Sequence, residues 1–186
     1  MGLIFYLRGS GPSHAKKLGR ELNMKMNVNT IVTNGVLAAL YIAVTALIMP
    51  FGFTNIQFRV SEIFNHLIVF DKKYFWGIMI GVFLANLFMS TLGAYELLGL
   101  SQTMISLLIT IAFGTIIKSK LILMGINTLV FTFNMYIVAF MLKLALGLPF
   151  LITWVTTAIG EFTVMAVGIP IIYAIHKRLQ FDKIMS

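Results

Sequence analysis

Ionisable and amide side chains interrupt stretches of this sequence that are otherwise almost wholly apolar. The carboxyl groups of Glu62 and Glu161 and the guanidinium group of Arg59 lie inside such stretches, and Glu96 lies at the edge of one. Because a charged group is costly to bury in a membrane, residues of this kind usually mark a functional site. Together with polar companions they form the candidate ligand-binding set, which is Glu161, Asn134, Trp154, Arg59, Glu62, Asn86, Glu96 and Gln102.

These residue types suit the capture of a small heteroaromatic molecule. Carboxyl and amide groups hydrogen-bond the edge of a flat ring, and an aromatic side chain such as Trp154 stacks on its face. Glu161 is the strongest candidate, because a lone carboxylate deep in apolar surroundings either stays protonated or finds a cationic or N–H-rich partner. A bound ligand can supply that partner.

Structural roles are the alternative for several of these residues. Arg59, Glu62 and His66 follow one another at spacings of three and four, which places them on one face of an α-helix. Arg59 and Glu62 could therefore form an internal ion pair instead of contacting a ligand. Asn134 could bond across helices, and Glu96 could simply be solvated at the membrane surface.

The sequence lacks the motifs of soluble catalysis and of metal binding. It contains no GxxxxGK[ST], HExxH or GxSxG pattern, no cysteine, and three widely spaced histidines. We therefore expect no enzyme activity, no metal site and no cofactor bound by this chain.

The composition is typical of a membrane-embedded helical bundle. Hydrophobic residues make up 59% and charged residues 11% of the chain, against about 45–50% and about 25% in soluble domains. The mean hydropathy is +0.95. A helix needs about 20 apolar residues to cross a bilayer. Six apolar blocks predict an all-α bundle of six transmembrane helices, and they are residues 30–49, 56–70, 74–92, 97–117, 121–146 and 150–175.

The remaining segments complete the predicted organisation. Residues 1–29 are read as a basic, flexible N-terminal tail, residues 30–178 as the six-helix membrane domain, and residues 179–186 as a cytoplasmic C-terminal tail. The block 56–70 is short, and a re-entrant segment there would leave five spans. Six spans place all but two of the 14 Lys and Arg residues on one side, the exceptions being Arg59 and Lys143.

The positive-inside rule assigns that basic side to the cytoplasm. We therefore expect a multi-pass protein of the cell membrane with both termini cytoplasmic, and we read the basic clusters as topology signals and not as a nucleic-acid surface. The polar residues then fall in the outer half of the bilayer. Because the inner half is almost purely apolar, this pattern favours a closed pocket that opens outward over a continuous pore.

Two of the predicted helices carry small residues at helical spacing. Since close helix packing in lipid needs small side chains, such stripes mark contact faces. The stripe in the third helix is expected to pack inside the bundle, and it is Gly77, Gly81 and Ala85. The stripe in the first helix could pack internally or could dock a separate membrane protein, and it is Gly35, Ala39, Ala43 and Ala46.

Several of these segments resemble one family of membrane proteins. The runs Gly35-Val-Leu-Ala-Ala-Leu-Tyr-Ile-Ala43, Ile56-Gln-Phe-Arg-Val-Ser-Glu62 and Ala85-Asn-Leu87 look like the QueT family, and so do Asn134 and the Gly160-Glu161 pair. These proteins are substrate-capture (S) components of energy-coupling factor (ECF) transporters. The resemblance implies a six-helix S-component, capture of a vitamin-like molecule from outside, and docking through Ala39 and Ala43. It also implies three partners, a membrane coupling (T) protein and two ATPase subunits that use ATP and Mg.

The resemblance also bears on the substrate. QueT relatives are associated with queuosine precursors, which are deazapurines with an amino arm, and we would expect acidic residues near position 95 or 96 and near the end of the fifth helix. This chain has Glu96 at the first place but Met141 and Lys143 at the second. A hydroxymethylpyrimidine or a pyridoxine-type vitamin is therefore an alternative substrate, and a stand-alone small-molecule channel or facilitator is the alternative class.

Overall fold

Every regular element in the described part of the chain is a helix. The computed structural model describes residues 28–52, 59–90 and 92–184. The α-helices are α2 (Val28–Gly52), α3 (Phe75–Met89), α4 (Glu96–Ile116), α5 (Lys120–Leu146), α6 (Phe150–Leu179) and α7 (Phe181–Ile184). Three 3₁₀ helices complete the set, η2 (Val60–Val69), η3 (Lys72–Tyr74) and η4 (Gly93–Tyr95). The prediction of an all-α fold is confirmed.

Four segments of the described residues are long and apolar enough to cross a bilayer. They comprise α2, η4 together with α4, α5, and α6. The 10 residues of η2 and the 15 residues of α3 are only about 20 Å and about 22 Å long, against a hydrocarbon core of about 30 Å. The predicted count of six spans thus stays a prediction.

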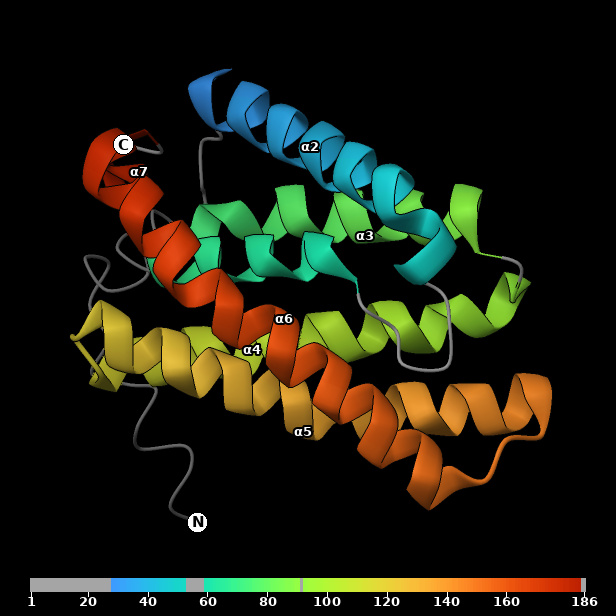
Figure 1. Ribbon diagram of the computed structural model, residues 1–186. Coiled ribbons are helices and arrows are strands. Elements are labelled where there is room, and N and C mark those ends of the chain that lie inside the picture. The colour runs from blue at the N-terminus through green and yellow to red at the C-terminus, as the bar shows by residue number, and fades with distance from the viewer. Residues whose placement is uncertain (1–27, 53–58, 91, 185–186) are drawn as a thin grey trace, which may run out of the picture.

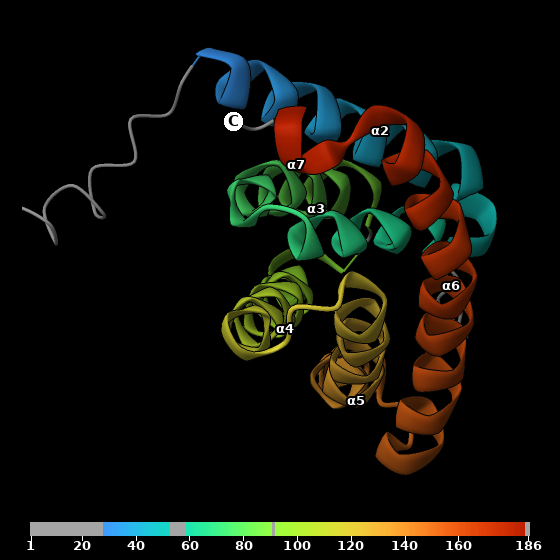
Figure 2. The same ribbon diagram turned by 90° about the vertical axis from the view of Figure 1, so that its left-hand side faces the viewer.

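Consecutive segments run in alternating directions across the bundle (Figure 1). As a result, α3 and α5 begin, and α4 and α6 end, at the same side. We call this side the basic end, because the loops and termini there carry Lys72, Lys73, Lys118, Lys120, Lys177 and Arg178. Figure 2, viewed from the basic end, shows α2 at one edge of the bundle and α4 and α5 at the opposite edge. Helix α6 runs from the α4–α5 edge to the α2 edge, and it contacts both α5 and η2.

The short helix η2 lies at the centre of this arrangement. It contacts α2, α3, α4, α5 and α6, and its side chains from Ser61 to Val69 are largely buried. A 3₁₀ helix has 3 residues per turn, so residues three apart are eclipsed. Arg59, Glu62 and Asn65 therefore form one row, and the expectation that His66 shares their face is wrong.

His66 points to a different set of neighbours. Its Nε2 donates to the carbonyl oxygen of Met165 (2.9 Å), and its Nδ1 accepts from the side-chain amide of Asn127 (3.2 Å). Asn127 in turn accepts from the hydroxyl of Thr110 (2.7 Å). This chain of hydrogen bonds ties η2 to α4, α5 and α6 in the half of the bundle nearer the basic end.

Helices α2 and α3 approach each other through glycines. A Cβ atom added at Gly81 would lie 2.8 Å from the Cβ of Tyr41, and one at Gly77 would lie 2.6 Å from Oδ1 of Asn34. The same Asn34 oxygen accepts a hydrogen bond from the backbone N–H of Gly77 (2.9 Å). The internal packing predicted for the third helix is thus confirmed.

The small residues of α2 face the other way. Gly35, Ala39, Ala43 and Ala46 are all exposed, and no atom comes within 4 Å of a Cβ placed on Gly35. No described helix covers this stripe.

The end of the chain folds back on the basic end of the bundle. Gln180 takes a left-handed conformation (φ 51°) that ends α6. Phe181 then packs its ring against Phe70 and Tyr74, and its carbonyl oxygen accepts from the hydroxyl of Tyr74 (2.9 Å). Part of the predicted C-terminal tail is therefore docked as α7. The predicted tail 1–29 falls outside the described residues except for its last two positions, which already belong to α2.

A matched pair of glycine substitutions tests the close approach of α2 and α3. Gly81→Ala would crowd Tyr41, and overpacking of about 1–3 kcal/mol outweighs the gain in helix propensity of about 1 kcal/mol. Gly35→Ala makes the same chemical change in open space and keeps only the gain. Thermal unfolding of the purified protein in detergent should show Gly81→Ala less stable than wild type and Gly35→Ala at least as stable. Equal stability of the two variants would contradict this packing.

Candidate functional site

The row of side chains on η2 is bonded to neighbours on α2 and α3. Arg59 and Glu62 form an ion pair (Nη1 to Oε1, 3.9 Å), and the hydroxyl of Tyr41 donates to the same Glu62 oxygen (2.9 Å). The Arg59 Nη2 donates to Oδ1 of Asn86, and the amide of Asn65 donates to Oε2 of Glu62. Arg59 and Glu62 are 8% and 3% exposed. The internal ion pair that the sequence allowed is therefore present in the structure.

Several buried polar atoms around this pair lack a hydrogen-bond partner in the described part of the chain. They include Oδ1 of Asn65, Nδ2 of Asn86 and Oε1 of Glu161. A guanidinium group only donates, so Arg59 must face the oxygen of Asn86, which leaves the Asn86 NH₂ group directed elsewhere. The set thus contains one donor and two acceptors. Because an unpaired buried group costs about 1–3 kcal/mol, a ligand that pairs with these atoms would gain affinity.

Carboxyl groups outnumber cations around Arg59. The guanidinium group interacts electrostatically with Glu62, Glu96 and Glu161, and Glu161 also interacts with Glu62. All three carboxyl groups are buried, Glu96 at 7% and Glu161 at 2% exposure. One cation therefore faces three acids in a poorly solvated space. An N–H-rich or cationic ligand group would give the additional carboxyl groups a partner.

Glu96 lies beside Asn86 at a glycine of α4. A Cβ atom on Gly99 would stand 3.2 Å from Oε2 of Glu96, 3.6 Å from Nδ2 of Asn86 and 3.8 Å from the sulfur of Met141. The hydroxyl of Ser90 donates to the other oxygen of Glu96. The interpretation of Glu96 as a merely solvated residue is therefore wrong. Met141 faces inward at the place where the family resemblance predicted an acid, whereas Lys143 is exposed.

Asn86 and Glu96 also line a cavity of about 360 Å³. Among its lining residues, Leu87 and Leu97 are exposed, so the cavity opens to the surface between α3 and α4. Binding pockets for small molecules typically measure about 300–1,000 Å³, so it has room for a small ring. The complete lining is Phe83, Asn86, Leu87, Gly93, Ala94, Glu96, Leu97 and Leu100.

Two more candidate residues link α4 to α5. The amide of Gln102 donates to the carbonyl oxygen of Phe131 (3.5 Å) and accepts from Thr103 (3.3 Å). The amide of Asn134 donates to the hydroxyl of Ser106 (2.9 Å). Both amides are buried. For Asn134, the bond across helices considered from the sequence is the one present in the structure.

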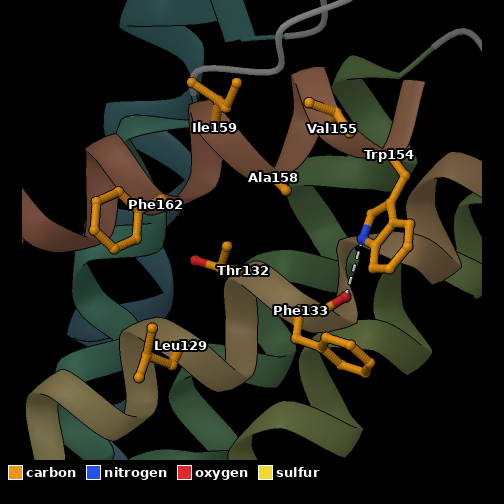
Figure 3. A pocket seen from close by; sticks show the side chains of 8 residues that line it. All are labelled: Leu129, Thr132, Phe133, Trp154, Val155, Ala158, Ile159 and Phe162. Carbon is orange, nitrogen blue, oxygen red and sulfur yellow. Dashed lines mark hydrogen bonds between the residues drawn. The ribbon is translucent and has the colours of Figure 1, made fainter. Parts of the chain in front are cut away.

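Trp154 lies in a different place, the α5–α6 groove (Figure 3). This groove has a volume of about 600 Å³, and its lining is Leu129, Thr132, Phe133, Trp154, Val155, Ala158, Ile159 and Phe162. The indole N–H donates to the carbonyl oxygen of Phe133 (3.2 Å), and the ring stacks on Phe150 at 6.2 Å. Trp154 is thus occupied by neighbours of its own helix pair and does not join the Arg59–Glu62 cluster.

The structure also adds residues that the sequence analysis did not select. Tyr41, Asn65 and Ser90 bond directly to the candidate carboxyl groups. Tyr41 could have been found, because Asn34, Tyr41 and Thr45 follow each other at helical spacing on the face of α2 opposite the alanine stripe. Ser90 gives no comparable signal, since it lies at the end of α3. In the described residues no group of three or more His, Cys, Asp or Glu side chains could hold a metal ion.

Comparison with known proteins places the chain in a family. The family model described as QueT transporter matches residues 31–177. A curated relative, the "Queuosine precursor transporter QueT" of Lactococcus lactis subsp. cremoris (strain MG1363), is 30% identical over 168 residues, which cover 86% of this chain and 99% of the relative. No solved structure matches. With its long apolar helices, the chain is a multi-pass membrane transporter protein that belongs to the QueT transporter family.

Proposed function

We propose that this chain is the substrate-capture subunit of an ECF-type importer and that its substrate is a queuosine precursor. The observation that carries the proposal is the buried cluster around Arg59 and Glu62, in which atoms of Asn65, Asn86 and Glu161 lack partners among the described residues. The printed name of the Lactococcus relative supplies the substrate class. The absence of a P-loop from the sequence also fits a subunit that captures a substrate but does not itself hydrolyse ATP.

The chemistry of the cluster favours a heteroaromatic ligand with a cationic arm. The Asn86 NH₂ group would donate to a ring nitrogen or carbonyl, and the Glu161 carboxyl would accept from a ring N–H or amino group. Glu96 would pair with the cationic arm, because it is the carboxyl that lines the surface-opening cavity. The excess of carboxyl groups around Arg59 favours such a ligand over an uncharged vitamin.

We further propose that six segments cross the membrane, with the basic end in the cytoplasm. The alternating directions of the segments support this count. The shortness of η2 is no obstacle, because five helices surround it and its backbone need not meet lipid. The Arg59–Glu62 cluster then lies toward the outer side, where an external substrate arrives.

The exposed stripe on α2 is the proposed contact with a membrane coupling (T) protein, which would connect this chain to two ATPase subunits that use ATP and Mg. Gly35, Ala39, Ala43 and Ala46 are uncovered, while the opposite face of α2 is filled by α3 and η2. Because these residues have small side chains or none, a partner helix can approach the α2 backbone closely.

Glu161→Gln tests the proposed ligand contact. Loss of a charged hydrogen bond worth about 1.5–3 kcal/mol should weaken binding of a radiolabelled queuosine precursor about 10–100-fold. Equilibrium binding to the purified chain in detergent measures this. Asp71→Asn, which makes a like change at the basic end, should leave affinity unchanged. Unaltered affinity of Glu161→Gln would remove this residue from the site. If wild type bound a hydroxymethylpyrimidine or pyridoxine more tightly than the queuosine precursor, that vitamin would be the substrate instead.

Introduced cysteines test the orientation. The sequence has no native cysteine, so Lys118→Cys and Lys143→Cys each create a single thiol. A membrane-impermeant maleimide should label Lys143→Cys on intact cells and should label Lys118→Cys only after the membrane is opened. The reverse labelling pattern would mean that the basic end faces outward. Labelling of both variants on intact cells would contradict the proposal that these two positions lie on opposite sides of the membrane.

A bulky residue on the α2 stripe tests the docking surface. Ala43→Trp should abolish co-purification of the coupling protein and the ATPases while leaving ligand affinity intact, because Ala43 points away from the bundle. Ala112→Trp places the same side chain at an exposed position of α4 and should have no effect. Loss of the complex in both variants, or in neither, would argue against this surface.

A further inference from the structure

A basic pocket of about 440 Å³ lies at the basic end, between the start of α5 and the end of α6. No acidic side chain lines it within the described part of the chain. Clustered cations repel each other unless an anion lies among them. None of the residues assigned to substrate capture lines this pocket. Its lining is Ser119, Lys120, Leu121, Tyr173, His176, Lys177, Gln180 and Lys183.

Several side chains that line this basic pocket carry hydrogen-bond donors. Lys120 gives one N–H to the carbonyl oxygen of Val69 (2.7 Å) and lies over the ring of Phe70, 5.8 Å from its centre. Its ammonium group has three N–H donors in all. The Nδ1 of His176 accepts from the backbone N–H of Phe181 (3.2 Å), so the ring proton is on Nε2. Ser119 makes no side-chain cap bond to α5, and the first N–H groups of a helix, which carry positive dipole charge, attract anions. A phosphate group fits this set of donors.

The basic pocket and the α5–α6 groove lie on the same side of the helix pair. Val155 in the groove and Tyr173 in the pocket are both on α6 and are five turns apart at about 3.6 residues per turn. On α5, Thr132 and Leu121 are about three turns apart. Between them, a Cβ on Gly125 would meet no atom within 4 Å. Leu121 and Leu129 on α5 are also exposed, so an open apolar strip runs along α5 from the groove toward the pocket.

The length of this path matches a lipid tail. From Lys120 to Thr132 the α5 helix rises about 18 Å, and one leaflet contributes about 15 Å of hydrocarbon. A molecule with a phosphate in the basic pocket would reach the groove of Figure 3 with an acyl chain. Soluble phosphates would use only the pocket.

We propose that the α5–α6 pair holds an anionic phospholipid of the leaflet at the basic end. The phosphate lies among Lys120, His176 and Lys177, and one acyl chain lies along Leu129 and Phe162. The site stands apart from substrate capture, and only its assignment to the cytoplasmic leaflet rests on the proposed orientation.

Lipid binding to the purified full-length chain, measured by native mass spectrometry in detergent, tests this site. The probes are phosphatidylglycerol, phosphatidylcholine with the same acyl chains, and inorganic phosphate. Wild type should bind phosphatidylglycerol in preference to the other two. Lys120→Gln combined with Lys177→Gln should weaken that binding about tenfold, since each cation near a membrane surface contributes to anionic-lipid affinity. Arg178→Gln removes a neighbouring charge outside the pocket and should change binding less than twofold.

A second variant tests the acyl chain separately. Ala158→Phe would fill the groove and should lower phosphatidylglycerol affinity without changing Lys120 or Lys177, and unfolding temperatures identify any variant that is misfolded. Equal phosphatidylglycerol binding by wild type and the double lysine variant would overturn the proposal. Equally tight binding of inorganic phosphate, unaffected by Ala158→Phe, would also overturn it, because the site would then recognise a soluble anion.

Discussion

The burial of the polar side chains of η2 is the constraint on which the rest of the structure depends. This helix of 10 residues carries Ser61, Glu62, Asn65 and His66, all almost wholly removed from solvent. In lipid each of these groups must find a partner within the protein. Their partners come from the surrounding helices, with Thr45 and Tyr41 on α2, Asn127 on α5 and Met165 on α6. The helices are thus held around η2 by its own polar groups.

This constraint is met unevenly along η2. Near the basic end His66 and Asn127 are bonded to each other and to further groups. Near the other end, Arg59 and Glu62 are paired. Atoms of Asn65, Asn86 and Glu161, however, have no hydrogen-bond partner among the described residues. A half-satisfied polar network is costly when empty and selective when a ligand completes it. The same helix can therefore hold the bundle together at one end and bind substrate at the other.

The sequence predicted the helices well because apolar length and small-residue spacing are local signals. The internal packing of the α3 glycines and the burial of Glu161 and Asn86 could be predicted in this way. The row of Arg59, Glu62 and Asn65 was not, since the choice of a 3₁₀ over an α-helix arises from packing against five neighbours. The inward turn of Glu96 depends on the glycine at position 99 and on Asn86 from another helix. Trp154 was grouped with the site because it is aromatic and stands near the start of the predicted sixth helix, but its direction from α6 places it in the α5–α6 groove.

The position of a bound ligand tests most directly whether the cluster around η2 is the capture site. An experimental structure of the protein with a queuosine precursor would supply it. The account predicts ligand nitrogen or oxygen atoms at hydrogen-bond distance, about 2.7–3.2 Å, from Oε1 of Glu161 and Nδ2 of Asn86. A ligand seated in the α5–α6 groove, with both of these atoms still unpaired, would contradict it.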